Sequence, residues 1–427
     1  MKKKMDTEIL KTSSTIKTVT EKDVKLIVKS CSLNTNAIIE NYVIHNASDK
    51  MLGFLSDYWK LKVQLLVSEN RLVLSFFIKA ISTTNEAKAK MVKDLKLFDK
   101  EVFFYNVIKR QLEISDMMPW CATLIRALPE AMVFDDLNAK GYQTKNKFER
   151  FDQDHTLQAL NTLARFHASS IIYEERKSKS LMRKYRINEE FEHYLNRGGY
   201  KISDPWYYQC MTGALEAVKK HSKYNNNKDL MDKIDKRWRE VWQAALKLSD
   251  TNNKRCVICH RDLWNNNILF HYKDVSNTEP DDCVLVDFQA VRYQEPAGDV
   301  MLLLYCNLDP IYRENNIYLY LNYYYEQLQR ILFEKGIEIN DVLKKEMFLT
   351  SAEEQRLWGL VVSACLIPQF WLDDSLITTT FGDTENFNQI LSKNKGAFII
   401  KMMAMNEGYK STVMGVFDEI VERYCVK

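Results

Sequence analysis

Residues 260–270 of this chain read HRDLWNNNILF, and residues 284–289 read VLVDFQ. Asp262 stands five residues before Asn267, and Asp287 ends an apolar run 20 residues after Asn267. Apolar runs lie on both sides of the first stretch, which predicts short buried strands with polar residues in the loops at their ends. We therefore expect two carboxylates and one amide to converge on a single site.

This order and spacing of Asp, Asn and Asp are typical of phosphotransferases. Phosphoryl transfer places charge on phosphate oxygens, so the protein acts by positioning groups and neutralising charge. Because Mg²⁺ prefers hard oxygen ligands, we predict that Asp287 is its main ligand and Asn267 its second. Asp262 is predicted to accept the proton of a substrate hydroxyl. A surface loop could contain any one of these residues by chance, but the whole set argues against that alternative.

An upstream lobe that holds ATP should contain a lysine inside apolar surroundings. Residues 72–80, LVLSFFIKA, form a β-rich run, and Lys79 resembles the strand lysine that contacts the α- and β-phosphates of ATP. Residues 98–108, FDKEVFFYNVI, have apolar residues at helical spacing and place Glu101 where it could pair with Lys79. Each residue alone would usually be solvated, but their order ahead of the Asp262 motif favours an ATP-binding pair.

A loop that covers the phosphates is expected before the strand at residues 61–67. The stretch at residues 51–58, MLGFLSDY, occupies that place but offers only Gly53 for close backbone approach to phosphates. We expect a looser loop than a glycine-rich one, with Ser56 as a further ATP-binding residue.

Residues 131–137, AMVFDDL, predict a strand that runs into a polar hinge between two lobes. Backbone groups near Asp135 and Leu137 are expected to hydrogen-bond the adenine of ATP. A junction of this kind also occurs in many other α/β proteins, so the pattern alone does not identify a nucleotide site.

The motifs at residues 77–79, 136–142, 163–168, 262–264 and 287–289 together resemble those of the ecdysteroid kinase-like family, also called CHK kinase-like proteins. These are relatives of choline kinases and aminoglycoside phosphotransferases, and the resemblance extends over residues 35–420. It implies an α+β, bilobal, protein-kinase-like fold, with an antiparallel sheet in a small N-terminal lobe and a larger, mainly helical C-terminal lobe. It also implies ATP- and Mg²⁺-dependent phosphorylation of a hydroxyl on a small molecule, such as an ecdysteroid, another sterol or a hydroxylated xenobiotic.

The chain departs from that family at Arg261, where the small-molecule kinases usually have glycine. The resulting His-Arg-Asp form is better known from protein kinases and keeps a protein substrate open as an alternative. Against that alternative, Gln289 replaces the glycine of the protein-kinase metal motif, and residues 296–299, PAGD, follow too soon for a long activation loop.

Two further alternatives remain. A choline- or ethanolamine-type kinase would need an aromatic cage with nearby acids, and residues 371–374, WLDD, leave that open. A pseudokinase that binds nucleotide without catalysis is disfavoured, because all five residues expected of an active kinase are present: Lys79, Glu101, Asp262, Asn267 and Asp287.

Composition agrees with a globular protein whose cysteines are reduced. The 427 residues are 46% hydrophobic and 27% charged, near globular averages. The net charge of +3 does not indicate a basic surface that binds nucleic acid. Nine scattered cysteines without metal-site spacing suggest reduced thiols in the cytoplasm. No apolar segment follows the basic N-terminus, and the longest apolar stretch, at residues 357–372, is shorter than a bilayer span and contains Pro368. We expect no membrane contact, and no oligomeric state follows from the sequence.

We expect three segments along the chain. Residues 1–20 are predicted to be a flexible N-terminal segment, residues 21–136 an ATP-binding lobe, and residues 137–427 a catalytic and substrate-binding lobe. His167, on an apolar helix face, is expected to be a hydrogen-bonded core residue. The tyrosine-rich run at residues 317–325 either packs the helical lobe or forms an apolar wall for a bulky substrate.

Overall fold

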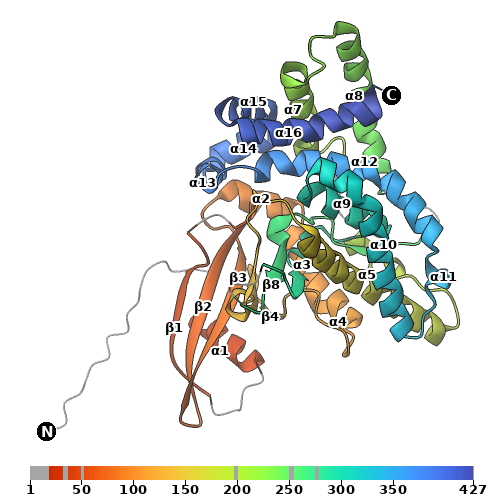
Figure 1. The fold of residues 1–427 in the computed structure, drawn as a ribbon. Helices are drawn as coiled ribbons and strands as arrows, with labels where there is room; N and C mark the ends of the chain where they lie inside the picture. The colour runs from red at the N-terminus through yellow and green to blue at the C-terminus, as the bar shows by residue number, and fades with distance from the viewer. Residues whose placement is uncertain are drawn as a thin grey trace.

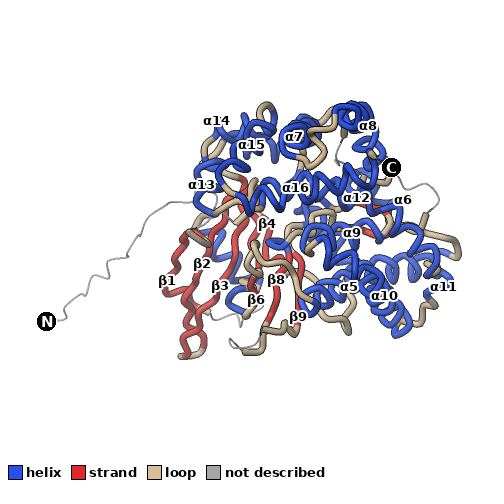
Figure 2. The backbone as a smooth tube through the Cα atoms, turned by 45° about the horizontal axis from the view of Figure 1, so that its top comes forward, coloured by secondary structure: helices blue, strands red, loops and turns tan. Residues whose placement is uncertain are grey.

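Two lobes of different composition lie side by side (Figure 1). The computed structural model describes residues 19–31, 37–49, 52–196, 201–249, 254–274 and 278–426. The predicted flexible segment at residues 1–20 therefore lies almost wholly outside the described residues. Strands gather at one side of the molecule and helices fill the other (Figure 2), which confirms the predicted bilobal α+β fold.

The N-terminal lobe is built on an antiparallel sheet of five strands in the order β1-β2-β3-β5-β4. Their bounds are β1 (Ile38–Asn46), β2 (Ser56–Val67), β3 (Asn70–Ile81), β4 (Leu124–Ala127) and β5 (Ala131–Asp135). Side chains alternate along β2, where Leu61, Val63 and Leu65 are buried and the residues between them are exposed. The buried face packs on α1 (Glu21–Ser30), whose first turn is closed by a capping box between Thr20 and Asp23.

A bent helical segment follows β3 and leads toward the second lobe. It comprises α2 (Glu86–Asp94), α3 (Leu97–Phe103), a π-helical turn η1 (Phe104–Ile108) and α4 (Lys109–Leu112). The helix predicted at residues 98–108 is thus confirmed, with a π-helical second half. Phe104 in η1 stacks on Phe288 at a centroid distance of 4.6 Å, which holds this helix against the loop that carries Asp287.

The C-terminal lobe is mainly helical, with a core of long helices that pack on one another. These are α5 (Gln153–Leu181), α9 (Pro296–Asn307), α10 (Pro310–Glu334) and α12 (Lys345–Phe370). Every residue of α9 is buried, so the apolar sequence of that helix is explained by its central position. The predicted buried helix at residues 357–372 is the second half of α12 and its end.

Further helices surround this core. They are α6 (Asn188–Leu195), α7 (Pro205–His221), α8 (Lys228–Lys247), α11 (Ile339–Val342), α13 (Asp374–Gly382), α14 (Thr384–Ser392), α15 (Lys395–Met405), α16 (Glu407–Ile420) and the π-helical η5 (Val421–Cys425). One of these helices contacts α2. Asn85, the N-cap of α2, donates a hydrogen bond to the carbonyl oxygen of Gly382 at 3.0 Å. This contact ties the end of α13 to the first helix after β3.

Two small sheets lie next to the hinge and carry the candidate site. One contains β6 (Tyr142–Gln143), β8 (Ile268–His271) and β9 (Asp282–Leu285); the other contains β7 (Val257–Cys259) and β10 (Arg292–Gln294). β5 ends at Asp135, and the chain then enters β6, which pairs with β8. The division of the chain at residues 136 and 137 stays a prediction.

The tyrosine-rich run at residues 317–325 lies within α10. Ile317, Tyr320, Leu321, Tyr324 and Tyr325 are buried in the lobe. Packing of the helical lobe therefore accounts for most of this run.

Helices α7 and α15 approach each other through glycine. A Cβ atom at Gly213 would lie 2.8 Å from the backbone nitrogen of Gly396, so Gly213→Ala should lower the free energy of unfolding by about 1–3 kcal/mol through overpacking. Gly415, in α16, has open space around it, and Gly415→Ala should instead be neutral or stabilise by up to about 1 kcal/mol. Urea unfolding of both variants measures the difference, and equal effects would contradict the close helix contact.

Candidate active site

The loop between β7 and β8 carries the sequence motif of residues 260–267 in a constrained conformation. Arg261 has a φ of 69°, a left-handed value that is unusual for a residue with a side chain. Asp299, fully buried at the start of α9, accepts hydrogen bonds from the backbone N–H groups of His260 at 2.5 Å and Arg261 at 2.9 Å. These two bonds hold the strained turn in place.

His167 supports the same turn from behind. One ring nitrogen lies 3.3 Å from an oxygen of Asp299 and the other 2.7 Å from the hydroxyl of Tyr324. Since the side chain is fully buried, the prediction that His167 is a hydrogen-bonded core residue is confirmed.

Asp262 and Asn267 face each other across the loop. The Asn267 amide nitrogen donates to the backbone oxygen and to the carboxylate of Asp262, both at 2.9 Å. This arrangement leaves the Asn267 amide oxygen as the atom that could bind a cation. Burial, together with the charge of Asp287, raises the pKa of Asp262 to about 8, while hydrogen bonding from Asn267 opposes that rise.

His260 links this loop to the segment before Asp287. Its Nε2 atom lies 2.9 Å from the backbone oxygen of Val286, and its Nδ1 accepts from the backbone N–H of Asp262 at 3.3 Å. The ring also lies against Phe288, at a centroid distance of 4.6 Å. The two parts of the sequence motif are therefore joined by direct contacts.

Lys79 forms the centre of a buried ion triad. Its ammonium lies 2.6 Å from the Glu101 carboxylate and 2.7 Å from that of Asp287. The second oxygen of Glu101 accepts from the backbone N–H of Phe288 at 3.1 Å. Strand β3, helix α3 and the loop after β9 thus meet at one point, as the sequence pattern of Lys79 and Glu101 predicts.

The charges of this triad do not balance. Burial lowers the pKa of Lys79, but the charges of Asp287 and Glu101 outweigh it and raise that pKa above its usual range. Burial raises the pKa of Glu101 to about 7 against the opposing effect of Lys79. One ammonium between two carboxylates leaves surplus negative charge, and a divalent cation beside Asp287 would offset it. Two oxygen donors of the kind that Mg²⁺ prefers, on Asp287 and Asn267, fit such an ion.

Two cavities meet at the triad. The first, of about 370 Å³, is lined by Lys79 and Glu101 and by the hinge residues Asp135 and Leu137. The second, of about 230 Å³, is lined by Gly53, Ser56 and Asp262. The predicted ATP-binding residues are thus divided between the two cavities.

Four residues line both cavities, and two of them are the predicted metal ligands. The four are Leu52, Tyr58, Asn267 and Asp287. Since Asp262 lines the second cavity and the hinge lines the first, the two predicted metal ligands lie between the predicted base and the predicted adenine site.

The hinge contains polar contacts that sequence reasoning missed. Asp136 accepts from the Ser75 hydroxyl at 2.6 Å and pairs with Lys60 at 3.2 Å. Burial raises the pKa of Asp136, but these two partners hold it below its usual value. The carboxylate of Asp135 accepts from the backbone N–H of Thr123 and from Lys140, so its side chain is already occupied.

Aromatic side chains from separate segments form the wall of the second cavity. Trp264 stacks on Phe370 at a centroid distance of 3.5 Å, Phe54 packs on Phe370 at 5.2 Å, and Trp206 lies nearby in the same wall. No described residue between 317 and 325 lines either cavity, so the apolar wall that the sequence suggested there is formed by other residues.

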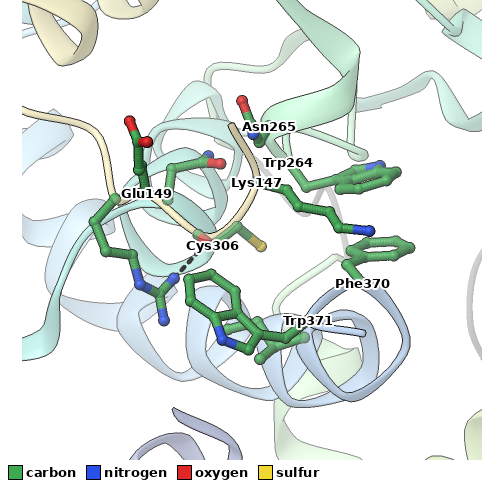
Figure 3. Close-up of a pocket in the computed structure, with 10 residues that line it drawn as sticks. Lys147, Glu149, Trp264, Asn265, Cys306, Phe370 and Trp371 are labelled. Carbon is green, nitrogen blue, oxygen red and sulfur yellow. Dashed lines mark hydrogen bonds between the residues drawn. The ribbon is translucent and has the colours of Figure 1, made fainter. Parts of the chain in front are cut away.

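A small cavity of about 20 Å³ lies next to this stack. Figure 3 shows Trp264 and Phe370 at one side of it, with Cys306 and Trp371 also in its lining. The volume has room for about one water molecule. The larger cavity beside Asp262 is therefore the one that could accept a substrate.

The fold and this site define a small-molecule kinase, a phosphotransferase with an alcohol group as acceptor. The chain belongs to the ecdysteroid kinase-like family, whose model matches residues 50–335, more than half of its length. Among curated proteins, no sequence matches the chain.

Several solved structures are distantly similar. An ethanolamine kinase from Plasmodium vivax is 12% identical, with 92% of this chain and 90% of that chain covered and a TM-score of 0.42. A choline/ethanolamine kinase family protein from Mesorhizobium loti is 11% identical, with 93% and 99% covered and a TM-score of 0.36. Choline kinase LicA from Streptococcus pneumoniae is 10% identical, with 92% and 99% covered and a TM-score of 0.34.

The helices were also compared with the requirements of a bilayer. In the part of the chain that the structure describes, no single helix is both long and apolar enough to cross a membrane. Helices α12 and α13 meet the length and composition requirement only as a pair, and they are bent by 93°.

The raised pKa of Asp262 predicts a pH-dependent cost in stability. Between about pH 4 and pH 8 the native state keeps a proton that the unfolded chain has released, so ionisation of Asp262 destabilises the fold as the pH rises. Asp262→Asn removes this effect. The variant should gain about 1–3 kcal/mol of unfolding free energy relative to wild type between pH 5 and pH 8.

Thermal and urea unfolding of ligand-free, magnesium-free protein measures this difference. The exposed Asp94→Asn provides a matched control, because it makes the same chemical change on the surface. A difference between Asp262→Asn and wild type that stays constant over this pH range would contradict a raised pKa.

Proposed function

We propose that this protein transfers the γ-phosphate of ATP to a hydroxyl group of an ecdysteroid, another sterol or a hydroxylated xenobiotic. The observation that carries the proposal is the meeting of two cavities at Asn267 and Asp287, with Asp262 on the side of the second cavity. A nucleotide in the first cavity and an acceptor in the second would place donor and acceptor groups on either side of these ligands.

The first cavity supplies contacts for ATP. Lys79, held by Glu101, would contact the α- and β-phosphates, and backbone groups near Asp135 and Leu137 would contact adenine. Gly53 and Ser56 line the second cavity together with Tyr58 and Asp287, so they would lie near the terminal phosphate. Asp287 and Asn267 would hold Mg²⁺, which neutralises negative charge on the phosphate oxygens.

The second cavity supplies the base. The acceptor oxygen bonds to the γ-phosphorus while the bond from that phosphorus to the bridging oxygen of ADP breaks, and the hydroxyl proton passes to the Asp262 carboxylate. The products are a phosphate ester and ADP. In its ionised form, a carboxylate whose pKa lies near 8 is a stronger base than an ordinary aspartate.

The wall of the second cavity favours a bulky apolar acceptor. Aromatic rings at positions 54, 206, 264 and 370 are combined with apolar chains such as Leu366 and Leu391. Polar side chains such as Asp204 and Gln369 also line this cavity and could orient the polar groups of an acceptor. Such a lining suits a rigid ring system that presents a hydroxyl. A xenobiotic acceptor would give the reaction a role in detoxification, and the free cysteines would suit the cytoplasm.

The arrangement around Trp371 disfavours a choline-type cage at that place. The guanidinium of Arg150 lies over the Trp371 ring at 4.2 Å, where a quaternary ammonium would have to sit. Asp374 pairs with Lys147 at 2.5 Å, and Asp373 caps α13. All three groups that the cage would need are therefore engaged within the protein.

Phosphate transfer from labelled ATP in the presence of Mg²⁺ tests the proposal directly. The acceptor panel should contain ecdysteroids, other sterols, phenols, glycosides and amino alcohols, with a generic protein substrate alongside. We expect transfer to the ring-bearing alcohols. Labelling of the protein substrate alone, or of amino alcohols alone, would reject the proposed acceptor class.

Asp262→Asn should separate binding from chemistry. The amide matches the carboxylate in size but is a far poorer proton acceptor, so single-turnover transfer at saturating ATP should slow by about 10²–10⁴-fold while ATP and acceptor affinities stay near those of wild type. An unchanged transfer rate would remove Asp262 from the role of base.

Asp287→Ala should remove the dependence of ATP affinity on Mg²⁺. Titration calorimetry with and without Mg²⁺ measures this, and circular dichroism checks that the fold is intact. Asp282→Ala serves as a nearby comparison, because its carboxylate pairs with Arg165 rather than with Lys79. If Asp287→Ala kept the wild-type gain in affinity on adding Mg²⁺, the assignment of the metal ligands would be wrong.

A further inference from the structure

The loop before β2 contains a single glycine, which limits the close approach of its backbone to phosphates. Residues 52–55 of this loop read LGFL, with Gly53 as the one glycine among them. A kinase that lacks a glycine-rich loop needs another donor for the negative charge at the end of ATP.

Tyr58 lies where such a donor is needed. It stands on β2 directly opposite Lys79 on β3, and residues paired in this way project from the same face of a sheet. Its ring packs beside Phe77 at a centroid distance of 5.7 Å. Tyr58 also lines both the first and the second cavity, so it borders the place where they meet.

The hydroxyl of Tyr58 lies close against Gly53. A Cβ atom at position 53 would be 2.4 Å from this hydroxyl oxygen, so a side chain at that position would displace it. Gly53 therefore makes room for the Tyr58 hydroxyl.

The phenol stays protonated in this environment. Burial raises the pKa of Tyr58, and the charges of Asp287 and Glu101 add to that rise against the effect of Lys79. Ser56, two residues before Tyr58 on β2, hydrogen-bonds with its side chain and opposes the rise. The phenol is thus an O–H donor at neutral pH, in a region of surplus negative charge.

We propose that the Tyr58 hydroxyl donates a hydrogen bond to the terminal phosphate of ATP and replaces a donor that a glycine-rich loop would provide. The inference rests on the proposed function and deepens it. The terminal phosphate is the group that must lie between the two cavities, and Tyr58 borders both. The lysine opposite Tyr58 is the one expected to contact the α- and β-phosphates, which leaves the next phosphate within reach of the tyrosine.

Tyr58→Phe tests the proposal, because it removes the hydroxyl and keeps the ring beside Phe77. With Mg²⁺ present, its affinity for the non-hydrolysable ATP analogue AMP-PNP should fall about tenfold to a hundredfold, the range of a hydrogen bond to a charged group. Its affinity for ADP should stay within about twofold of wild type, since ADP lacks the terminal phosphate.

Tyr42→Phe is the matched control. Tyr42 lies on β1 of the same sheet, paired with Val63 and packed on the core of the N-terminal lobe, outside both cavities. This variant should bind both nucleotides as wild type does.

Gly53→Ala provides an independent route to the same loss. The added methyl group should displace the Tyr58 hydroxyl and lower the affinity for AMP-PNP more than the affinity for ADP. The double variant with Tyr58→Phe should lose less binding free energy for AMP-PNP than the sum of the two single variants, because both changes remove the same contact.

The outcomes separate this inference from the proposed function. Wild-type protein that binds neither nucleotide with Mg²⁺ would overturn both. A different result would overturn the Tyr58 inference alone. In that case wild-type protein binds both nucleotides, and Tyr58→Phe either keeps the wild-type affinities or loses affinity equally for ADP and AMP-PNP.

Discussion

The contact on which the rest of the site depends is the ammonium of Lys79 between the carboxylates of Glu101 and Asp287, at 2.6 and 2.7 Å. Each of the three residues belongs to a different segment: β3, α3 and the loop after β9. Because a buried charge without a partner is strongly unfavourable, any movement that separates these segments is opposed. The two lobes are held together at the point where the two cavities meet.

A buried triad of this kind contributes little net stability, since removing the charges from water costs about as much as their attraction returns. Its value lies in geometry. The surplus negative charge and the raised pKa values of Glu101 and Asp262 indicate a site that is electrostatically unfavourable in the absence of ligands. The proposed cation and the phosphate chain of ATP would complete such a site, so ligand binding and stability would be linked.

The surrounding structure keeps the loops of the site in strained conformations. Arg261 and Asp287 both have a φ of 69°, and each is fixed by neighbours. Asp299 accepts two hydrogen bonds from the first loop, and Glu101 accepts one from the residue after Asp287. Stacking of Phe104 on Phe288 adds an apolar contact. These contacts offset the cost of the strained backbone and orient the carboxylates.

The sequence by itself determined the fold class, the family, the motif of residues 260–267 and the pairing of Lys79 with Glu101, because each depends on local spacing or on residue types in a fixed order. Only the tertiary structure decided the wall of the second cavity, the place of Tyr58, and the packing role of the tyrosine-rich run in α10. Phe54, Trp206, Trp264 and Phe370 come from four segments far apart in the chain. Their convergence depends on how the helices pack. The hydrophobic periodicity of one segment predicts which of its residues are buried, but not which of them line a cavity.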